Sequence, residues 1–121
     1  MSKVLIVDDD GPIREFLKIL FEGRGHEVIS AEDGKEGLAK AESEGPDLIV
    51  LDMNMPVMTG WDAARELKKE GAATAKIPII ALTAQKTLDD QIEAHESGCD
   101  AFVEKPIDAD RLFNAVERVL K

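Results

Sequence analysis

Five side chains that could do chemistry stand at or just past the end of a short apolar run. They are the carboxylates of Asp8, Asp9 and Asp52, the hydroxyl of Thr83 and the ammonium of Lys105. A single carboxylate in such a place is most simply a turn residue, because Asp favours turns. Four apolar runs that all end in this way favour a shared site instead.

The three carboxylates would repel one another if they lay close together, so a proton or a cation should bind among them. All are oxygen ligands, and no His or Cys stands nearby in the sequence to suggest zinc. Magnesium fits best, because it binds through one or two carboxylates, several waters and a phosphate oxygen. The Thr83 hydroxyl and the Lys105 ammonium suit an anion with several oxygens. Together these groups indicate a phosphoryl-transfer site.

The nucleophile of such a site would need no general base. A carboxylate is already ionised at neutral pH and can form an acyl phosphate directly. Asp52 is the candidate, because the apolar residues 48–51 before it are typical of a strand buried on both faces. Asp8 and Asp9 would then hold the metal ion.

Alternating strands and helices are expected to position these residues. The sequence predicts strands at 4–7, 28–31, 48–51, 78–82 and 101–103, and helices at 12–23, 35–44, 61–69, 88–97 and 109–121. Asp10 and Asp108 are the predicted N-caps of the first and last helices. The alternation indicates an α/β fold, with a parallel sheet, helices on both faces and right-handed crossovers. Ligands of such sheets bind beyond the carboxyl ends of the strands, which is where the reactive side chains fall.

Composition narrows the class of protein. The 121 residues suffice for one domain, residues 1–121, and the net charge of -10 disfavours direct binding to nucleic acid. The single cysteine, Cys99, excludes an internal disulfide and suits a reducing compartment. The sequence shows no signal peptide and no apolar run of membrane length, so we expect a cytoplasmic protein without membrane insertion.

The chain resembles, over its whole length, the receiver domains of two-component response regulators. The resemblance rests on four motifs, which are Val7-Asp8-Asp9, Leu51-Asp52-Met53-Asn54-Met55-Pro56 with Gly60, Leu82-Thr83-Ala84, and Lys105-Pro106. It implies a flavodoxin-like fold, a doubly wound five-stranded sheet of order 2-1-3-4-5 flanked by five helices.

The resemblance also implies roles for the residues of the site. Asp52 would accept a phosphoryl group from the His of a sensor kinase or of a histidine phosphotransfer protein. Asp8 and Asp9 would position Mg²⁺ together with Asp52, and the backbone carbonyl of Asn54 would be a further ligand. Lys105 would pair with the phosphoryl oxygens.

Two further features come with the family. The Lys105–Pro106 peptide bond is expected to be cis. Thr83 would be the switch hydroxyl that moves toward the phosphate, and Phe102 takes the position of the aromatic switch residue. Tyr is frequent there, and Phe offers no hydroxyl to a partner.

Several functions remain open at this point. The first is a stand-alone receiver that controls protein partners through phosphorylation and is not a conventional turnover enzyme. The chain could also be a phosphorelay intermediate, or the excised receiver of a multidomain regulator or hybrid kinase. A phosphatase of the haloacid-dehalogenase type would usually carry an Asp at position 54, where this chain has Asn54. His26 and His95 are expected to be surface or hydrogen-bonded residues without a catalytic role.

Overall fold

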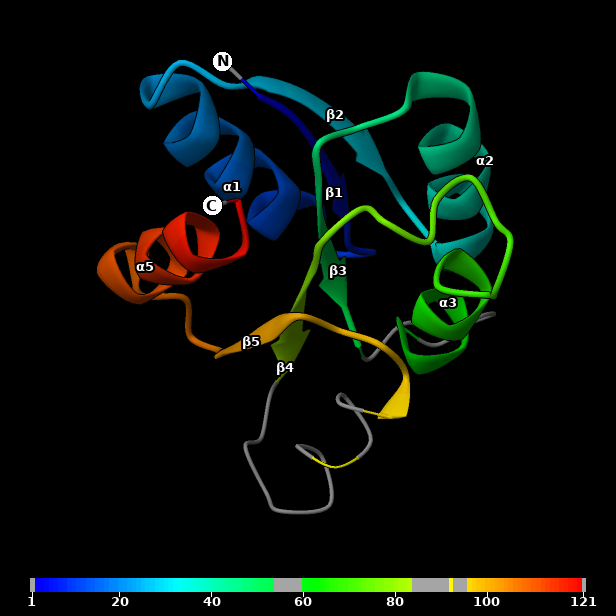
Figure 1. Ribbon diagram of the computed structural model, residues 1–121. Helices are drawn as coiled ribbons and strands as arrows, with labels where there is room; N and C mark the ends of the chain where they lie inside the picture. Colours follow the sequence, from blue (N-terminus) through cyan, green and yellow to red (C-terminus); the bar gives the residue numbers. More distant parts are fainter. Residues whose placement is uncertain (1, 54–59, 84–91, 93–95, 121) are drawn as a thin grey trace.

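The computed structural model describes residues 2–53, 60–83, 92 and 96–120. Five parallel strands form one sheet in the order β2-β1-β3-β4-β5 (Figure 1). The strands are β1 (Lys3–Val7), β2 (Glu27–Ala31), β3 (Leu48–Asp52), β4 (Ile79–Thr83) and β5 (Ala101–Glu104). The parallel sheet and its strand order are as predicted.

Four helices are described, and they are α1 (Gly11–Gly23), α2 (Gly34–Glu44), α3 (Gly60–Leu67) and α5 (Ala109–Val119). They correspond to four of the five predicted helices. The remaining one, at residues 88–97, falls almost entirely outside the described residues. Among the described helices, none is both long and apolar enough to cross a membrane.

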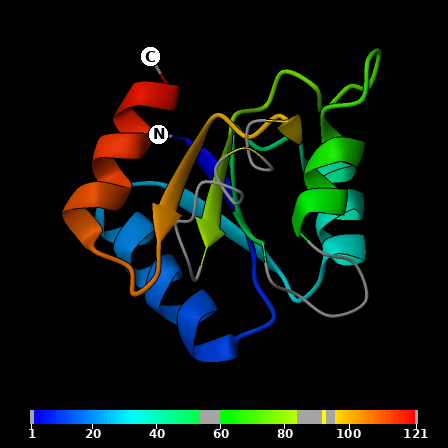
Figure 2. The same ribbon diagram turned by 90° about the horizontal axis from the view of Figure 1, so that it is seen from below.

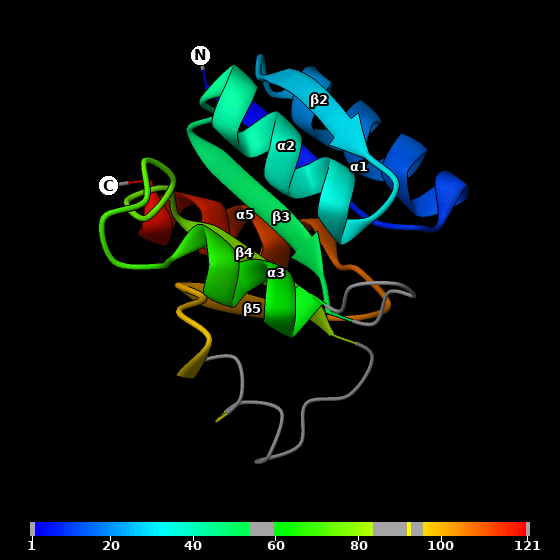
Figure 3. The same ribbon diagram turned by 90° about the vertical axis from the view of Figure 1, so that its right-hand side faces the viewer.

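The helices cover the two faces of the sheet in pairs. Figure 2 shows α1 and α5 on one side and α2 and α3 on the other, and Figure 3 views the second pair in front of the sheet. Alternate strand residues point to opposite faces. In β3, Leu48 and Val50 therefore pack with α1 and α5, whereas Ile49 and Leu51 pack with α2 and α3. β3 lies at the centre of the sheet and is buried along its whole length.

Aspartate side chains cap the first turns of three helices and so fix where these helices begin. Asp10 caps α1 by accepting the Ile13 N–H, and Asp108 caps α5 by accepting the Arg111 N–H, so both predicted caps are confirmed. Asp33, which the sequence suggested only as a turn residue, caps α2 in the same way.

Gly60 lies inside α3, whereas the sequence predicted it in the loop before that helix. Its N–H donates to the Met53 carbonyl at 3.1 Å. A Cβ atom at this position would come within 2.2 Å of the Asp52 carbonyl oxygen. Only glycine allows the start of α3 to approach the end of β3 so closely.

Candidate functional site

The carboxyl edge of the sheet brings together side chains from four strands. Asp52 and Thr83 are the last residues of β3 and β4, Asp8 directly follows β1, and Lys105 directly follows β5. The strand register aligns these ends, since Asp52 pairs with Leu82 and Thr83 with Glu104. The close approach is therefore a consequence of parallel pairing.

Asp8, Asp9 and Asp52 form a compact acidic group. One carboxylate oxygen from each lies within 4.8 Å of the other two. Asp8 is 0% exposed and Asp52 is 1% exposed, whereas Asp9 is exposed. The group therefore has two buried walls and one side that solvent reaches.

Lys105 supplies the positive charge of the site. Its Nζ lies 3.2 Å from Oδ1 of Asp52 and 3.6 Å from Oδ2 of Asp8. Its N–H donates to the Thr83 carbonyl at 2.7 Å, which ties the segment after β5 to the end of β4. The Lys105–Pro106 peptide bond is cis, as the resemblance implies.

The electrostatics of Asp8 show that negative charge is in excess. Its Oδ1 accepts the Asp10 N–H at 2.9 Å, but its Oδ2 is buried and has no hydrogen-bond partner among the described residues. The pKa of Asp8 is raised to about 6, mainly by burial and to a smaller extent by the neighbouring Asp52, while the Asp10 N–H and Lys105 act in the opposite direction. Lys105 is the one ammonium that faces this group of three carboxylic acids within the described residues.

These features fit a hard divalent cation. Oδ2 of Asp8 is a buried oxygen that accepts no hydrogen bond from any described residue, and Asp9 and Asp52 place further carboxylate oxygens beside it. Oxygen ligands of this kind suit Mg²⁺. Asn54, which the resemblance adds as a ligand through its carbonyl, lies outside the described residues.

The Asp52 side chain is buried, although a residue at the carboxyl end of a central strand is expected to face the open crevice where ligands bind. The side chain is only 2% exposed, and the Lys105 ammonium lies against Oδ1. The reason is tertiary, since Lys105 enters from the other side of β4, two strands away in the sheet.

Arg14 belongs to the site, although the sequence did not mark it. It donates from Nη1 to the main-chain oxygen of Asp8 at 2.7 Å. Its Nη2 lies 3.6 Å from Oε1 of Glu32, at the start of the segment that leads into α2. In the sequence Arg14 looks like any charged residue of an amphipathic helix. It follows Asp10 by four positions, which places both residues on the same face of the helix, and this spacing is the one sign in the sequence that Arg14 lies near the loop.

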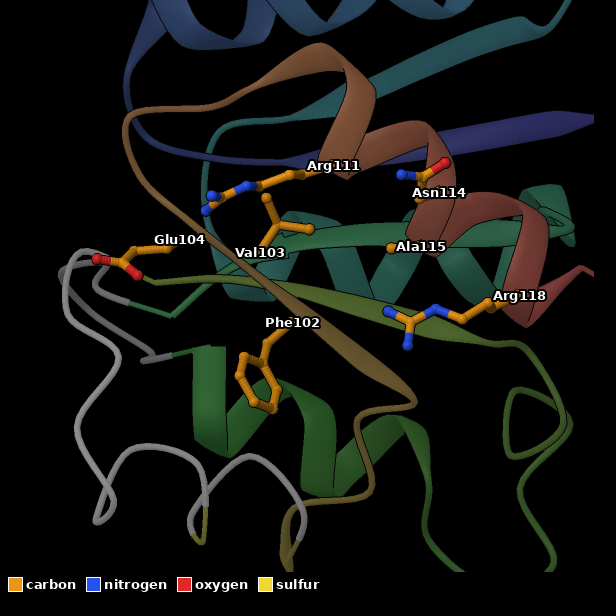
Figure 4. A pocket seen from close by; sticks show the side chains of 7 residues that line it. All are labelled: Phe102, Val103, Glu104, Arg111, Asn114, Ala115 and Arg118. Carbon is orange, nitrogen blue, oxygen red and sulfur yellow. The ribbon is translucent and has the colours of Figure 1, made fainter.

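Thr83 and Phe102 lie on neighbouring strands, in β4 and β5. Thr83 is buried at the edge beside the acidic group, and Phe102 is half-buried. Phe102 borders a cavity of about 500 Å³, which Figure 4 shows from close by. In that view its ring points to the opposite side of β5 from Val103, in agreement with its packing on the α2 and α3 side.

His26, which the sequence predicted to be non-catalytic, lies away from the site. His26 precedes β2 and therefore lies near the amino edge of the sheet. It is half-buried with its ring 5.7 Å from that of Phe21, and Nδ1 is buried without a hydrogen-bond partner among the described residues. The expectation that His26 has no catalytic role stays a prediction, and His95 lies outside the described residues.

The doubly wound sheet with its acidic carboxyl edge places the chain among flavodoxin-like α/β proteins. A family model of the response regulator receiver domain matches residues 4–117. The chain therefore belongs to the response regulator receiver family of two-component signalling.

Particular relatives agree with this assignment. The chain is 35% identical over 120 residues to protein PilH of Pseudomonas aeruginosa, covering 99% of this chain and 98% of PilH. It is 36% identical to the chemotaxis protein CheY4 of Vibrio cholerae, whose crystal structure superposes with a TM-score of 0.92 over 99% of each chain.

Other relatives are longer. The chain is 38% identical over 120 residues to the probable transcriptional regulator ycf27 of Porphyridium aerugineum, covering 99% of this chain and 48% of that protein. It thus spans about half the length of such regulators.

Proposed function

We propose that this chain is a single-domain response regulator, with residues 1–121 as its receiver domain. Asp52 accepts a phosphoryl group from the histidine of a sensor kinase or phosphotransfer protein in a magnesium-dependent reaction. The observation that carries the proposal is the contact of 3.2 Å between Lys105 Nζ and Asp52 Oδ1 within a pocket of three carboxylates. The match along nearly the whole of PilH supports a regulator of one domain.

In the proposed reaction, a carboxylate oxygen of Asp52 forms the new bond to phosphorus. The P–N bond to the donor histidine breaks, and its electron pair stays on the imidazole nitrogen, which takes up a proton from water. Lys105 moves its ammonium from the carboxylate to the equatorial phosphoryl oxygens and neutralises their charge. Mg²⁺, when bound, supplies further positive charge to these oxygens. Asp8, Asp9, Asp52 and the Asn54 carbonyl are its proposed protein ligands.

Asp52 is a better acceptor than Asp8 for two reasons. Asp8 uses Oδ1 to accept the Asp10 N–H, and its raised pKa of about 6 leaves it partly protonated near neutrality. Asp52 has Lys105 beside it, so the charge that arrives with the phosphoryl group meets a cation at once. Asp9 is exposed and is better placed to hold the metal ion.

The donor is proposed to be a protein that covers an apolar surface beside Lys105. Phe16 and Ile19 of α1 are 45% and 60% exposed, which is unusual for large apolar side chains. A pocket of about 290 Å³ adjoins Phe16, and it is lined by Ile13, Phe16, Lys105, Pro106 and Ile107. A docked protein that buried this surface would bring its histidine close to the acceptor.

The downstream target is likewise proposed to be a protein, with no direct binding to nucleic acid. Thr83 and Phe102 are the proposed switch, because they lie on the paired strands β4 and β5. Thr83 ends β4 at the side of the sheet where the acidic group lies, and Phe102 borders the cavity beside α5 (Figure 4). The phosphoryl group would draw the Thr83 hydroxyl inward and change the space available to the Phe102 ring. This is a two-state equilibrium that charge at Asp52 would bias.

A cytoplasmic location is part of the proposal. Burial raises the pKa of the Cys99 thiol to about 11, so this free cysteine stays protonated and unreactive, as suits a structural thiol in a reducing compartment.

The proposal is tested with the wild-type protein, phosphoramidate and either Mg²⁺ or EDTA. Intact-mass measurement should show one added phosphoryl group with Mg²⁺, removed by hydroxylamine as an acyl phosphate is, and none with EDTA. Steady hydrolysis of p-nitrophenyl phosphate should be absent. Sustained turnover of that ester would instead assign the chain to the aspartyl-phosphate phosphatases.

A further inference from the structure

Arg14 turns back from α1 toward the loop that carries the acidic pair. Its Nη1 donates to the Asp8 main-chain oxygen at 2.7 Å, and its side chain is 20% exposed. Lys18, one turn further along α1, is exposed and makes no hydrogen bond or ion pair within the described part of the chain. The two cations of α1 therefore differ in what they contact, although the sequence makes them look alike.

The carbonyl that Arg14 binds belongs to the peptide group between Asp8 and Asp9. The hydrogen bond therefore fixes the plane of that peptide and, with it, the direction in which Asp9 leaves the main chain. The Asp8 side chain has its own anchor, the Asp10 N–H. The exposed Asp9 carboxylate has no hydrogen bond or ion pair to any residue that the structure describes. The contact at the peptide group is thus the nearest one that orients Asp9.

We propose that Arg14 is a positioning residue for the metal site, which holds the Asp8–Asp9 peptide so that the Asp9 carboxylate meets the cation. This inference rests on the proposed function. Partners of metal ligands commonly fix ligand orientation and raise affinity in this way. Glu32 is the lesser partner of Arg14, because its side chain is 76% exposed and lies 3.6 Å away.

The charge of Arg14 and its hydrogen bond have opposite effects on cation binding. A guanidinium near the site repels Mg²⁺, so its removal would strengthen binding if charge alone mattered. Removal of the hydrogen bond frees the peptide group and would weaken binding. The sign of the change therefore separates a positioning role from a purely electrostatic one.

The test compares three variants of the full chain. Arg14→Met removes both the charge and the donor, Arg14→Lys keeps the charge and one donor group, and Lys18→Met removes one charge from the exposed face of the same helix. Mg²⁺ affinity is measured by isothermal titration calorimetry, and the Asp9 amide is followed by NMR during the titration. Thermal unfolding without Mg²⁺ shows whether each variant is folded.

Arg14→Met should bind Mg²⁺ about 10- to 100-fold more weakly than the wild type, the usual effect of losing such a partner. Arg14→Lys should lie between them, and Lys18→Met should bind as the wild type does. With phosphoramidate, Arg14→Met should need more Mg²⁺ for half-maximal labelling yet reach nearly the same maximal rate. If Arg14→Met is unfolded, Arg14→Lys is compared with the wild type instead, and a smaller loss of Mg²⁺ affinity is expected.

The proposal is overturned if Arg14→Met binds Mg²⁺ as tightly as the wild type or more tightly. If Arg14→Met is unfolded, the same result for Arg14→Lys overturns it. It is also overturned if Lys18→Met loses as much affinity as the Arg14 variant. These outcomes differ from failure of the proposed function, in which the wild type itself would show no Mg²⁺-dependent phosphoryl uptake.

Discussion

Two lysine–aspartate clusters lie at opposite edges of the same sheet, and they differ in how completely they are bonded. At the amino edge, Lys68 Nζ donates to Asp100 Oδ2 at 3.0 Å and to the Ile77 carbonyl at 2.7 Å. The same Asp100 oxygen accepts the Ile79 N–H at 2.9 Å. One cation meets one carboxylate there, and main-chain groups take up the remaining bonds.

The cluster at the carboxyl edge is unbalanced. Lys105 faces Asp52 and Asp8, the exposed Asp9 adds a third carboxylate, and Asp8 Oδ2 has no hydrogen-bond partner among the described residues. The comparison shows that clusters of the same residue types can have different roles. The balanced cluster holds α3 to the start of β4, while the unbalanced one is a group of carboxylates that could hold a metal ion.

The largest expected effect comes from removing the lysine of each cluster. Lys105→Ala leaves two buried carboxylates without their cation, and we expect the free energy of unfolding without Mg²⁺ to fall by roughly 3 kcal/mol. Saturating Mg²⁺ should restore much of this loss. Lys68→Ala should cost about 1–2 kcal/mol, and Mg²⁺ should restore none of it, because the Asp100 side chain is 41% exposed and still accepts the Ile79 N–H. Urea unfolding with and without Mg²⁺ measures the free energy of unfolding of both variants. If Mg²⁺ stabilised the two variants equally, the proposed difference between the clusters would be contradicted.

The pH dependence of stability should also separate the two edges. The pKa of Asp8 is raised from 3.8 to about 6 in the folded protein, mainly by burial, so the folded state holds its proton more tightly. The stability from this proton is complete below pH 3.8 and is lost as the pH rises through 6. In EDTA, the free energy of unfolding of the wild type relative to Asp8→Asn should therefore fall by up to about 3 kcal/mol on going from about pH 4 to pH 7.

Asp100→Asn is the matched control for this pH series. The difference in free energy of unfolding between the wild type and Asp100→Asn should not show the fall with rising pH that is expected for Asp8→Asn. A flat difference for Asp8→Asn would mean that Asp8 does not carry the excess charge.

A smaller effect is expected from Mg²⁺ on the wild type. A cation that binds only the folded state should raise the free energy of unfolding by about 2.7 kcal/mol at a hundredfold excess over the dissociation constant. Asp9→Asn should stay folded and lose most of this gain, because it removes the exposed ligand. Calorimetric melting at matched ionic strength, with Na⁺ in place of Mg²⁺, provides the control. An unchanged wild-type midpoint at saturating Mg²⁺ would contradict the acidic-pocket interpretation.

The sequence predicted much of the scaffold, because local patterns determine it. The apolar runs predicted all five strands, the alternation with helices predicted parallel pairing, and Asp10 and Asp108 were predictable as caps from their position before helices. The strand order came from the family resemblance. The residues gathered at the carboxyl edge followed from where the apolar runs end.

What the sequence could not predict depends on contacts between distant elements. The contact between Asp52 and Lys105 joins residues that are 53 positions apart in the chain. The hydrogen bond from Arg14 to Asp8 depends on where helix α1 packs against the sheet. The same packing leaves Nδ1 of His26 without a hydrogen-bond partner among the residues that the structure describes. Periodicity shows which face of a helix is buried, but not which single polar side chain on its border reaches back to a loop.

The central claim is that Asp52 alone, among the three carboxylates of the unbalanced cluster, accepts the phosphoryl group. The most direct measurement is peptide mapping by mass spectrometry of the wild type and of Asp52→Asn after reaction with phosphoramidate and Mg²⁺. The wild type should carry one phosphoryl group on Asp52, and a folded Asp52→Asn protein should carry none, whereas Asp8→Asn should still be labelled at Asp52, but slowly. Labelling that persists in folded Asp52→Asn, or that maps to Asp8, Asp9, His26 or His95 in the wild type, would contradict the account.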